Sequence, residues 1–134
     1  MKVCLRYKKT CLEDEEIRVT KDFIQFLQSH LPLNSEVTID MVPKRINVMT
    51  TGLRLPKSKI IVLANGRILI DILRTLSHEW VHEFQHQKLG VEDFKKTKDI
   101  GGPEENMANV LSGILMKKFQ VSMPQYQSTL YGED

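Results

Sequence analysis

The most constraining feature of the sequence is a long amphipathic segment from Ile68 to about Leu89. Apolar residues recur along it at helical spacing, and Gly90 stands where such a helix would end. The apolar residues are Leu69, Leu73, Leu76, Trp80 and Phe84. At 100° per residue, His78 and His82 lie roughly opposite this stripe. The segment predicts a helix with one face packed in a core and the other face carrying polar side chains.

The remaining sequence predicts an α+β fold with a small, mostly antiparallel sheet of about three or four strands packed on the 68–89 helix. We expect one compact domain over residues 1–120 and a loose tail over residues 121–134. The expected strands are residues 1–8, Glu36–Val42, Ile46–Leu55 and Ser58–Leu63, and the further helices are Glu13–His30 at the N-terminal side and Pro103–Phe119.

The 103–119 segment has an apolar stripe that predicts its buried face. Met107, Val110, Leu111, Ile114 and Leu115 fall at helical spacing, and Glu105, Asn109, Ser112 and Met116 lie on the opposite face. The small residues Ala108, Ser112 and Gly113 would allow close approach to the 68–89 helix.

Composition excludes several classes of protein. The chain of 134 residues has 19 Lys and Arg against 17 Asp and Glu, a net charge of +2, which is too small to suggest a nucleic-acid partner. No apolar run approaches the roughly 18 residues needed to span a bilayer, and charges interrupt the N-terminus. With Cys4 and Cys11 read as free thiols, we expect a cytoplasmic protein without a membrane partner.

The polar face of the 68–89 helix carries the pattern H-E-x-x-H as His78-Glu79-Trp80-Val81-His82. Residues four apart share a helical face, so both imidazoles can bind one Zn²⁺. Glu79 sits about 100° around the helix from His78 and about 60° from His82. It is therefore near the metal without being well placed to bind it, as a base for the metal-bound water should be. His86 continues the spacing, but it lies about 12 Å along the axis from His78 and cannot bind the same ion. We expect it to be a substrate-facing or surface residue.

A third ligand is required, and the first turn of the 103–119 helix offers Glu105 and Glu104. Glu105 shares a face with Asn109, whereas Glu104 points about 100° away, so Glu105 is our choice. Asn109 is expected to hydrogen-bond a ligating histidine. The expected cofactor is one Zn²⁺ per chain, although the same donor set also accepts Mn²⁺, Fe²⁺ or Co²⁺.

The two motifs together resemble the gluzincins, in which H-E-x-x-H is followed by a glutamate on a later helix. Glu105-Asn106-Met107-Ala108-Asn109 is similar to the E-x-x-A-N motif of the ImmA/IrrE-like metallopeptidases. The resemblance covers about residues 58–120. The sequence lacks the proline that commonly follows this family's second motif. The resemblance implies a minimal zincin-like fold in which Ile60–Leu63 or Thr51–Leu55 pairs with an extended peptide.

The expected function is that of a zinc metallopeptidase whose substrate is a protein or peptide. We expect a narrow substrate range or a single dedicated protein substrate. In the reaction, Glu79 takes a proton from water. Candidates for contacts to substrate or transition state are His86, Tyr126, Tyr131 and Arg54. The 91–102 loop, with Gly101-Gly102 as a hinge, is a candidate lid. Two alternatives stay open: a catalytically weak zinc-containing regulatory or binding module, and a DNA-associated protease suggested by Lys95-Lys96-Thr97-Lys98.

Overall fold

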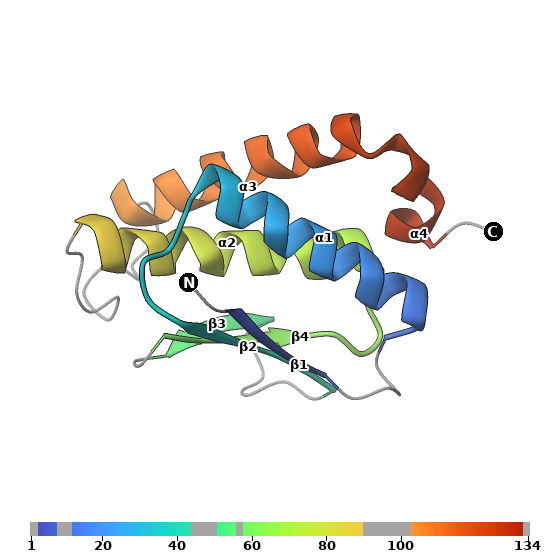
Figure 1. Ribbon diagram of the computed structural model, residues 1–134, viewed down its shortest axis with the longest axis horizontal. Coiled ribbons are helices and arrows are strands. Elements are labelled where there is room, and N and C mark those ends of the chain that lie inside the picture. The colour runs from blue at the N-terminus through green and yellow to red at the C-terminus, as the bar shows by residue number, and fades with distance from the viewer. Residues whose placement is uncertain (1–2, 8–11, 44–50, 56–57, 90–102, 133–134) are drawn as a thin grey trace.

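The computed structural model describes residues 3–7, 12–43, 51–55, 58–89 and 103–132 of the chain (Figure 1). Its elements, in chain order, are β1 (Val3–Tyr7), α1 (Asp14–His30), β2 (Val37–Val42), β3 (Gly52–Leu55), β4 (Lys59–Leu63), α2 (Leu69–Leu89), α3 (Pro103–Ser122), the 3₁₀ turn η2 (Pro124–Tyr126) and α4 (Gln127–Tyr131). The three long helices that the sequence predicts are therefore confirmed, with shifted boundaries, and each predicted strand segment contains a strand. The fold is a small α+β domain.

The four strands form a mixed sheet in the order β1-β2-β4-β3. The β1/β2 and β2/β4 pairs are parallel, and the β3/β4 pair is antiparallel. The expectation of a mostly antiparallel sheet is therefore wrong. Parallel neighbours need a long crossover connection, and α1 supplies it between β1 and β2. The order also makes β3 an edge strand and leaves β4 paired on both sides.

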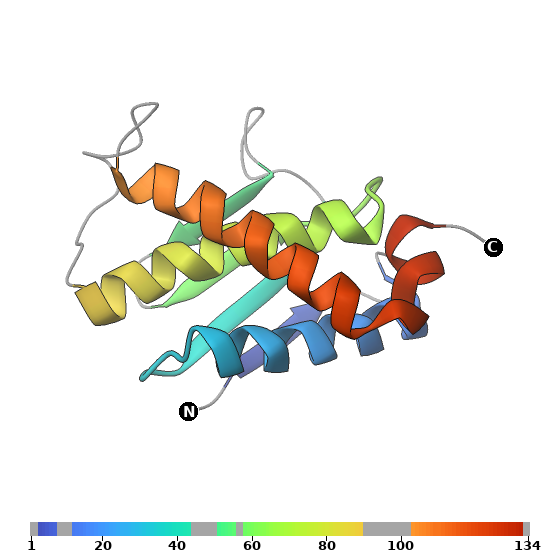
Figure 2. The same ribbon diagram turned by 90° about the horizontal axis from the view of Figure 1, so that it is seen from above.

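All the helices lie on one face of the sheet (Figure 1). α2 packs directly over β3 and β4, with α1 beside it and α3 stacked above (Figures 1 and 2). In β2, Val37, Ile39 and Met41 alternate inward and are at most 2% exposed. On the other face, Asp40 accepts hydrogen bonds from Arg6 and lies 3.2 Å from the Lys59 ammonium, and these partners lower the pKa of its carboxyl. The apolar side chains on this one face of the sheet therefore form a common core with the helices.

α3 buries only part of its predicted apolar stripe: Leu115 is buried and Leu111 packs against the core. Val110 is 60% exposed and Ile114 is 44% exposed, whereas Ala108 and Ser112 are buried. The small side chains allow α3 to approach α2 closely, as expected, and this approach places the Glu105 side of α3 against α2. The buried set is Ala108, Ser112, Leu115, Met116 and Phe119.

The expected loose C-terminal tail is instead helical through Tyr131. α3 extends to Ser122, and η2 and α4 then fold back against α1 and α2. Leu130 is fully buried, and the Tyr126 hydroxyl donates a hydrogen bond to the Asp22 carboxylate of α1. Burial of two anchoring side chains explains why this segment is ordered.

Several expectations concern residues outside the described ones: the thiol of Cys11, residues 46–50 of the expected Ile46–Leu55 strand, Gly90 as the end of a helix, the 91–102 loop as a lid, and the Lys95–Lys98 cluster. Cys4 is described and has a free, half-buried thiol. Within the described ranges, no helix combines the length and apolar character that crossing a bilayer requires.

Candidate metal centre

Three side chains from two helices converge beside the sheet. His78 and His82 project from one face of α2, and Glu105 reaches them from the first turn of α3. The Nε2 atoms of the two histidines lie 3.2 Å apart, and each is 2.9 Å from one oxygen of the Glu105 carboxylate. The structure thus brings together the three residues that the sequence singles out as ligands, and it selects Glu105 over Glu104.

These distances can be compared with what a metal ion requires. Four-coordinate Zn²⁺ with bonds of about 2.0–2.1 Å separates neighbouring ligand atoms by about 3.3 Å. The three ligand atoms lie within 4.8 Å of one another. The separation of the two Nε2 atoms, 3.2 Å, and that of His82 Nε2 from Glu105 Oε1, 2.9 Å, are near 3.3 Å. Burial, the largest contribution, lowers the pKa of His78, which favours the neutral imidazole that a metal needs. The donor set therefore fits a zinc ion.

Gln85 orients the second histidine. Its Oε1 lies 2.9 Å from His82 Nδ1, and its Nε2 donates to the backbone carbonyl of Glu104 at 2.9 Å. If Nδ1 carries the proton of His82, the lone pair of Nε2 faces the other ligand atoms. Gln85 is fully buried. Sequence reasoning missed this residue, although its position three residues after His82 on the same helix was the available signal.

We predict that Gln85→Ala weakens zinc binding by about 10- to 100-fold, because it releases both the His82 ring and the start of α3. Competition with a chromophoric chelator measures the affinity. Gln25→Ala, on the exposed face of α1, is the matched control and should leave the affinity unchanged. Equal affinities of the Gln85→Ala variant and the unsubstituted protein would contradict the positioning role.

Glu79 lies beside the ligands in a desolvated environment. Burial and the nearby negative charge of Glu105 raise the pKa of its carboxyl to about 7, against an opposing effect of Arg54. The start of β3 packs directly on it: a Cβ added to Gly52 would stand 3.3 Å from Glu79 Cγ and 2.3 Å from Thr75 Cγ2. A glycine is therefore required where the edge strand crosses α2 at this carboxyl.

A second, overlapping H-E-x-x-H pattern, His82-Glu83-Phe84-Gln85-His86, continues along the same helix. Glu83 is fully buried and accepts hydrogen bonds from Arg54 Nε, Ser58 Oγ and Gln87 Nε2, at 2.7, 2.7 and 2.6 Å. His86 is exposed and is not among the clustered ligands. The structure therefore favours the first pattern and gives Glu83 the role of tying β3 to α2.

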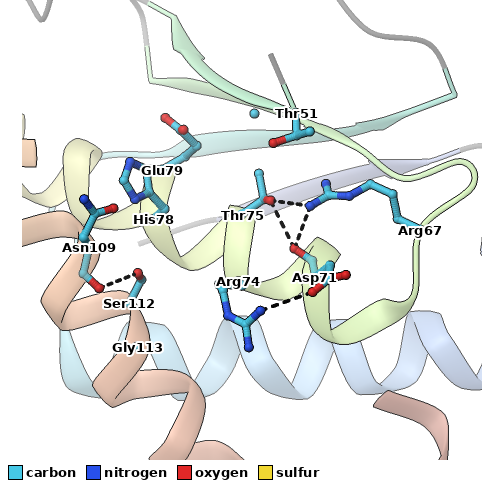
Figure 3. A pocket seen from close by; sticks show the side chains of 11 residues that line it. Thr51, Arg67, Asp71, Arg74, Thr75, His78, Glu79, Asn109, Ser112 and Gly113 are labelled. Carbon is cyan, nitrogen blue, oxygen red and sulfur yellow. Dashed lines mark hydrogen bonds and ion pairs between the residues drawn. The ribbon is translucent and has the colours of Figure 1, made fainter. Parts of the chain in front are cut away.

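A cavity of about 560 Å³ opens beside His78 and Glu79 (Figure 3). It extends along α2 toward the N-terminus of that helix, between the beginning of β3 and the middle of α3. Asn109 lines it next to His78, while the Nδ1 of His82 pairs with Gln85 rather than with Asn109. The cavity gives a ligand access to both the Glu79 carboxyl and the His78 side chain.

The two tyrosines proposed as substrate contacts lie elsewhere. Tyr126 is bonded to Asp22, and Tyr131 donates a hydrogen bond to Gln120 at 2.9 Å. Gln120 is fifteen residues after Glu105 on α3, which corresponds to about 22 Å along the helix axis. Both tyrosines therefore support the far end of α3 and do not reach the cavity. Arg54, the other candidate, is committed to Glu83 with a side chain only 7% exposed.

No known protein family matches the chain, and neither the curated proteins nor the solved structures contain a match. The support for a function is therefore the geometry of the described residues. That geometry consists of two histidines and a carboxylate that fit one metal ion, a carboxyl of raised pKa beside them, and a cavity that reaches both.

Proposed function

We propose that the protein is a zinc-dependent peptidase in which Glu79 moves the proton during peptide-bond hydrolysis. The observation that carries this proposal is the convergence of the His78, His82 and Glu105 ligand atoms beside Glu79 at the cavity. A metal site with a purely structural role is usually closed by a fourth protein ligand. Among the described residues, the group of possible ligands contains three members, which suits a site that keeps a position open for chemistry.

His78, His82 and Glu105 would hold the metal ion. When bound, zinc supplies a Lewis acid that makes water acidic near neutral pH and polarises a carbonyl. The chain's own contribution is to keep the His78 imidazole neutral through burial, which lowers its pKa, and to orient His82 through its hydrogen bond with Gln85.

Glu79 has the properties of a proton carrier. A pKa of about 7 in the metal-free protein lies near working pH, where a group both accepts and releases a proton readily. Glu79 would accept a proton from the attacking water and donate it to the departing amine. Its place at the cavity gives it access to a substrate, and its desolvation strengthens the interaction with a developing charge.

The edge strand β3 offers a way to align the substrate. β4 is paired on both sides, so Gly52–Leu55, and not Ile60–Leu63, has a free edge for an extended peptide within the described sheet. Gly52 packs against Glu79. A peptide added to β3 would therefore lie close to the proton carrier. We propose that the natural substrate is a particular protein and not peptides in general.

Metal analysis and a cleavage assay together test the proposal. We expect one zinc per chain and cleavage of only a few sequences within a diverse peptide library, detected by mass spectrometry. His82→Ala and Glu105→Ala should lose both, because each removes one of three ligands. His30→Ala, on the exposed end of α1, is the matched control and should retain both.

The outcomes separate the open alternatives. Zinc without cleavage of any library peptide would favour a regulatory or binding module. Zinc that persists in both ligand variants would overturn the site itself. The Lys95–Lys98 segment lies outside the described residues, so no structural observation favours a DNA-associated protease.

A further inference from the structure

The cavity has a cationic end that the proposed chemistry does not use. Beyond His78 and Glu79 it continues past Thr75 to Arg74, Asp71 and Arg67 (Figure 3). Arg74 lies one helical turn before His78, about 6 Å along the axis of α2. Two guanidinium groups and one carboxylate therefore line the part of the cavity that lies beyond His78 and Glu79.

Arg67 is held along the cavity wall by a set of hydrogen bonds. Its Nη1 donates to the Leu63 carbonyl at 2.9 Å, and its Nη2 donates to the Asp71 carbonyl at 3.0 Å and to Thr75 Oγ1 at 2.8 Å. The contacts connect the end of β4 to the first turns of α2 and fix the cation in place, which reduces the entropy that a ligand must spend to engage it.

Arg74 already has a carboxylate partner at this end of the cavity. Its Nη1 lies 3.2 Å from Asp71 Oδ1, and the two side chains are 54% and 47% exposed. An exposed pair at this spacing contributes little to stability. Arg74 can therefore exchange Asp71 for a carboxylate of a ligand, and the present pairing shows that its guanidinium reaches a carboxylate at this position.

We propose that this end of the cavity is a subsite for an acidic side chain of the substrate, recognised by Arg74 and Arg67. The inference rests on the proposed peptidase function and adds a substrate class to it. An extended peptide advances about 3.3 Å per residue. The helical rise from His78 to Arg74 thus corresponds to about two substrate residues, so the acidic residue would lie within two positions of the cleaved bond.

Binding of substrate-like hydroxamates tests the subsite without relying on turnover. The probes are dipeptide hydroxamates with glutamate at either position, each matched to its glutamine analogue, titrated calorimetrically into the zinc-loaded protein. We expect at least one glutamate compound to bind about tenfold more tightly than its analogue, as one charge-assisted hydrogen bond would give. Arg74→Gln should reduce this ratio to about twofold or less, and Arg74→Glu should reverse it.

Arg74 is more than half exposed, so neither substitution should unfold the protein. Arg18→Gln, an exposed arginine of α1, is the matched control and should keep the tenfold ratio. Equal binding of glutamate and glutamine compounds, or a ratio that survives Arg74→Glu, would overturn the subsite. An acid preference in a protein that cleaves no peptide would support the subsite and overturn the peptidase. Cleavage of peptides without a preference for glutamate would support the peptidase and overturn the subsite.

Discussion

Glu79→Gln should reduce peptide cleavage by about 10²- to 10⁴-fold while leaving one zinc per chain. Glutamine keeps the size of the side chain but cannot carry a proton, and a positioned general base contributes a factor of this order. Glu79 is not among the three clustered ligand residues, so metal content should not change. Initial rates on a cleaved library peptide and metal analysis of the same preparation measure the two quantities.

The same substitution has a second signature in the metal-free protein. The folded-state pKa of Glu79 is about 7, above its ordinary value of 4.5, so the folded protein binds this proton more tightly than the unfolded chain does. The free energy of unfolding therefore falls as pH rises from about 4.5 to 7, by up to about 3 kcal/mol. The Glu79→Gln variant does not lose stability in this way as pH rises. Its free energy of unfolding should therefore exceed that of the unsubstituted protein at pH 8 but not at pH 4.

These two signatures distinguish a catalytic role from a structural one. Loss of cleavage with retained zinc and a gain in stability at pH 8 would support Glu79 as the proton carrier. Unchanged cleavage rates would contradict that role. Lost zinc would instead show that Glu79 supports the ligands, and the peptidase proposal would then need another base.

Glu83→Ala should lower the free energy of unfolding by about 3–5 kcal/mol. The substitution leaves the Arg54 guanidinium, 7% exposed, without the carboxylate that neutralises it at 2.7 Å. Removing one partner of a buried ion pair typically has this cost. The substitution also removes the carboxylate oxygen that accepts hydrogen bonds from Ser58 and Gln87. These two hydrogen bonds join Ser58, just before β4, to the end of α2. Urea unfolding followed by circular dichroism measures the change.

Glu15→Ala is the matched control for this prediction. It also removes a carboxylate from an arginine, Arg18, but that pair is exposed on α1. Its loss should cost less than about 1 kcal/mol. A similarly small cost for Glu83→Ala would contradict the view that the buried pair holds the edge strand on α2.

The sequence by itself predicts the features that depend on local periodicity. The 3.6-residue repeat places His78 and His82 together and Trp80 in the core, because a helix fixes these directions whatever surrounds it. The choice of Glu105 also follows from its position in a helical first turn and from the need for a third ligand. These expectations required no knowledge of which strands pair.

The tertiary structure decided whatever depends on contacts between distant segments. Strand pairing made the sheet mixed and left β3 at its edge, and close helix packing buried Ala108 while exposing Val110. The tertiary structure also distinguished the two overlapping H-E-x-x-H patterns, which begin at His78 and at His82. Glu83 meets Arg54 across 29 residues of chain, and Gln85 meets the Glu104 carbonyl across 19. Such partners are invisible to local periodicity, because hydrogen bonding and burial depend on which surfaces meet after the chain has folded.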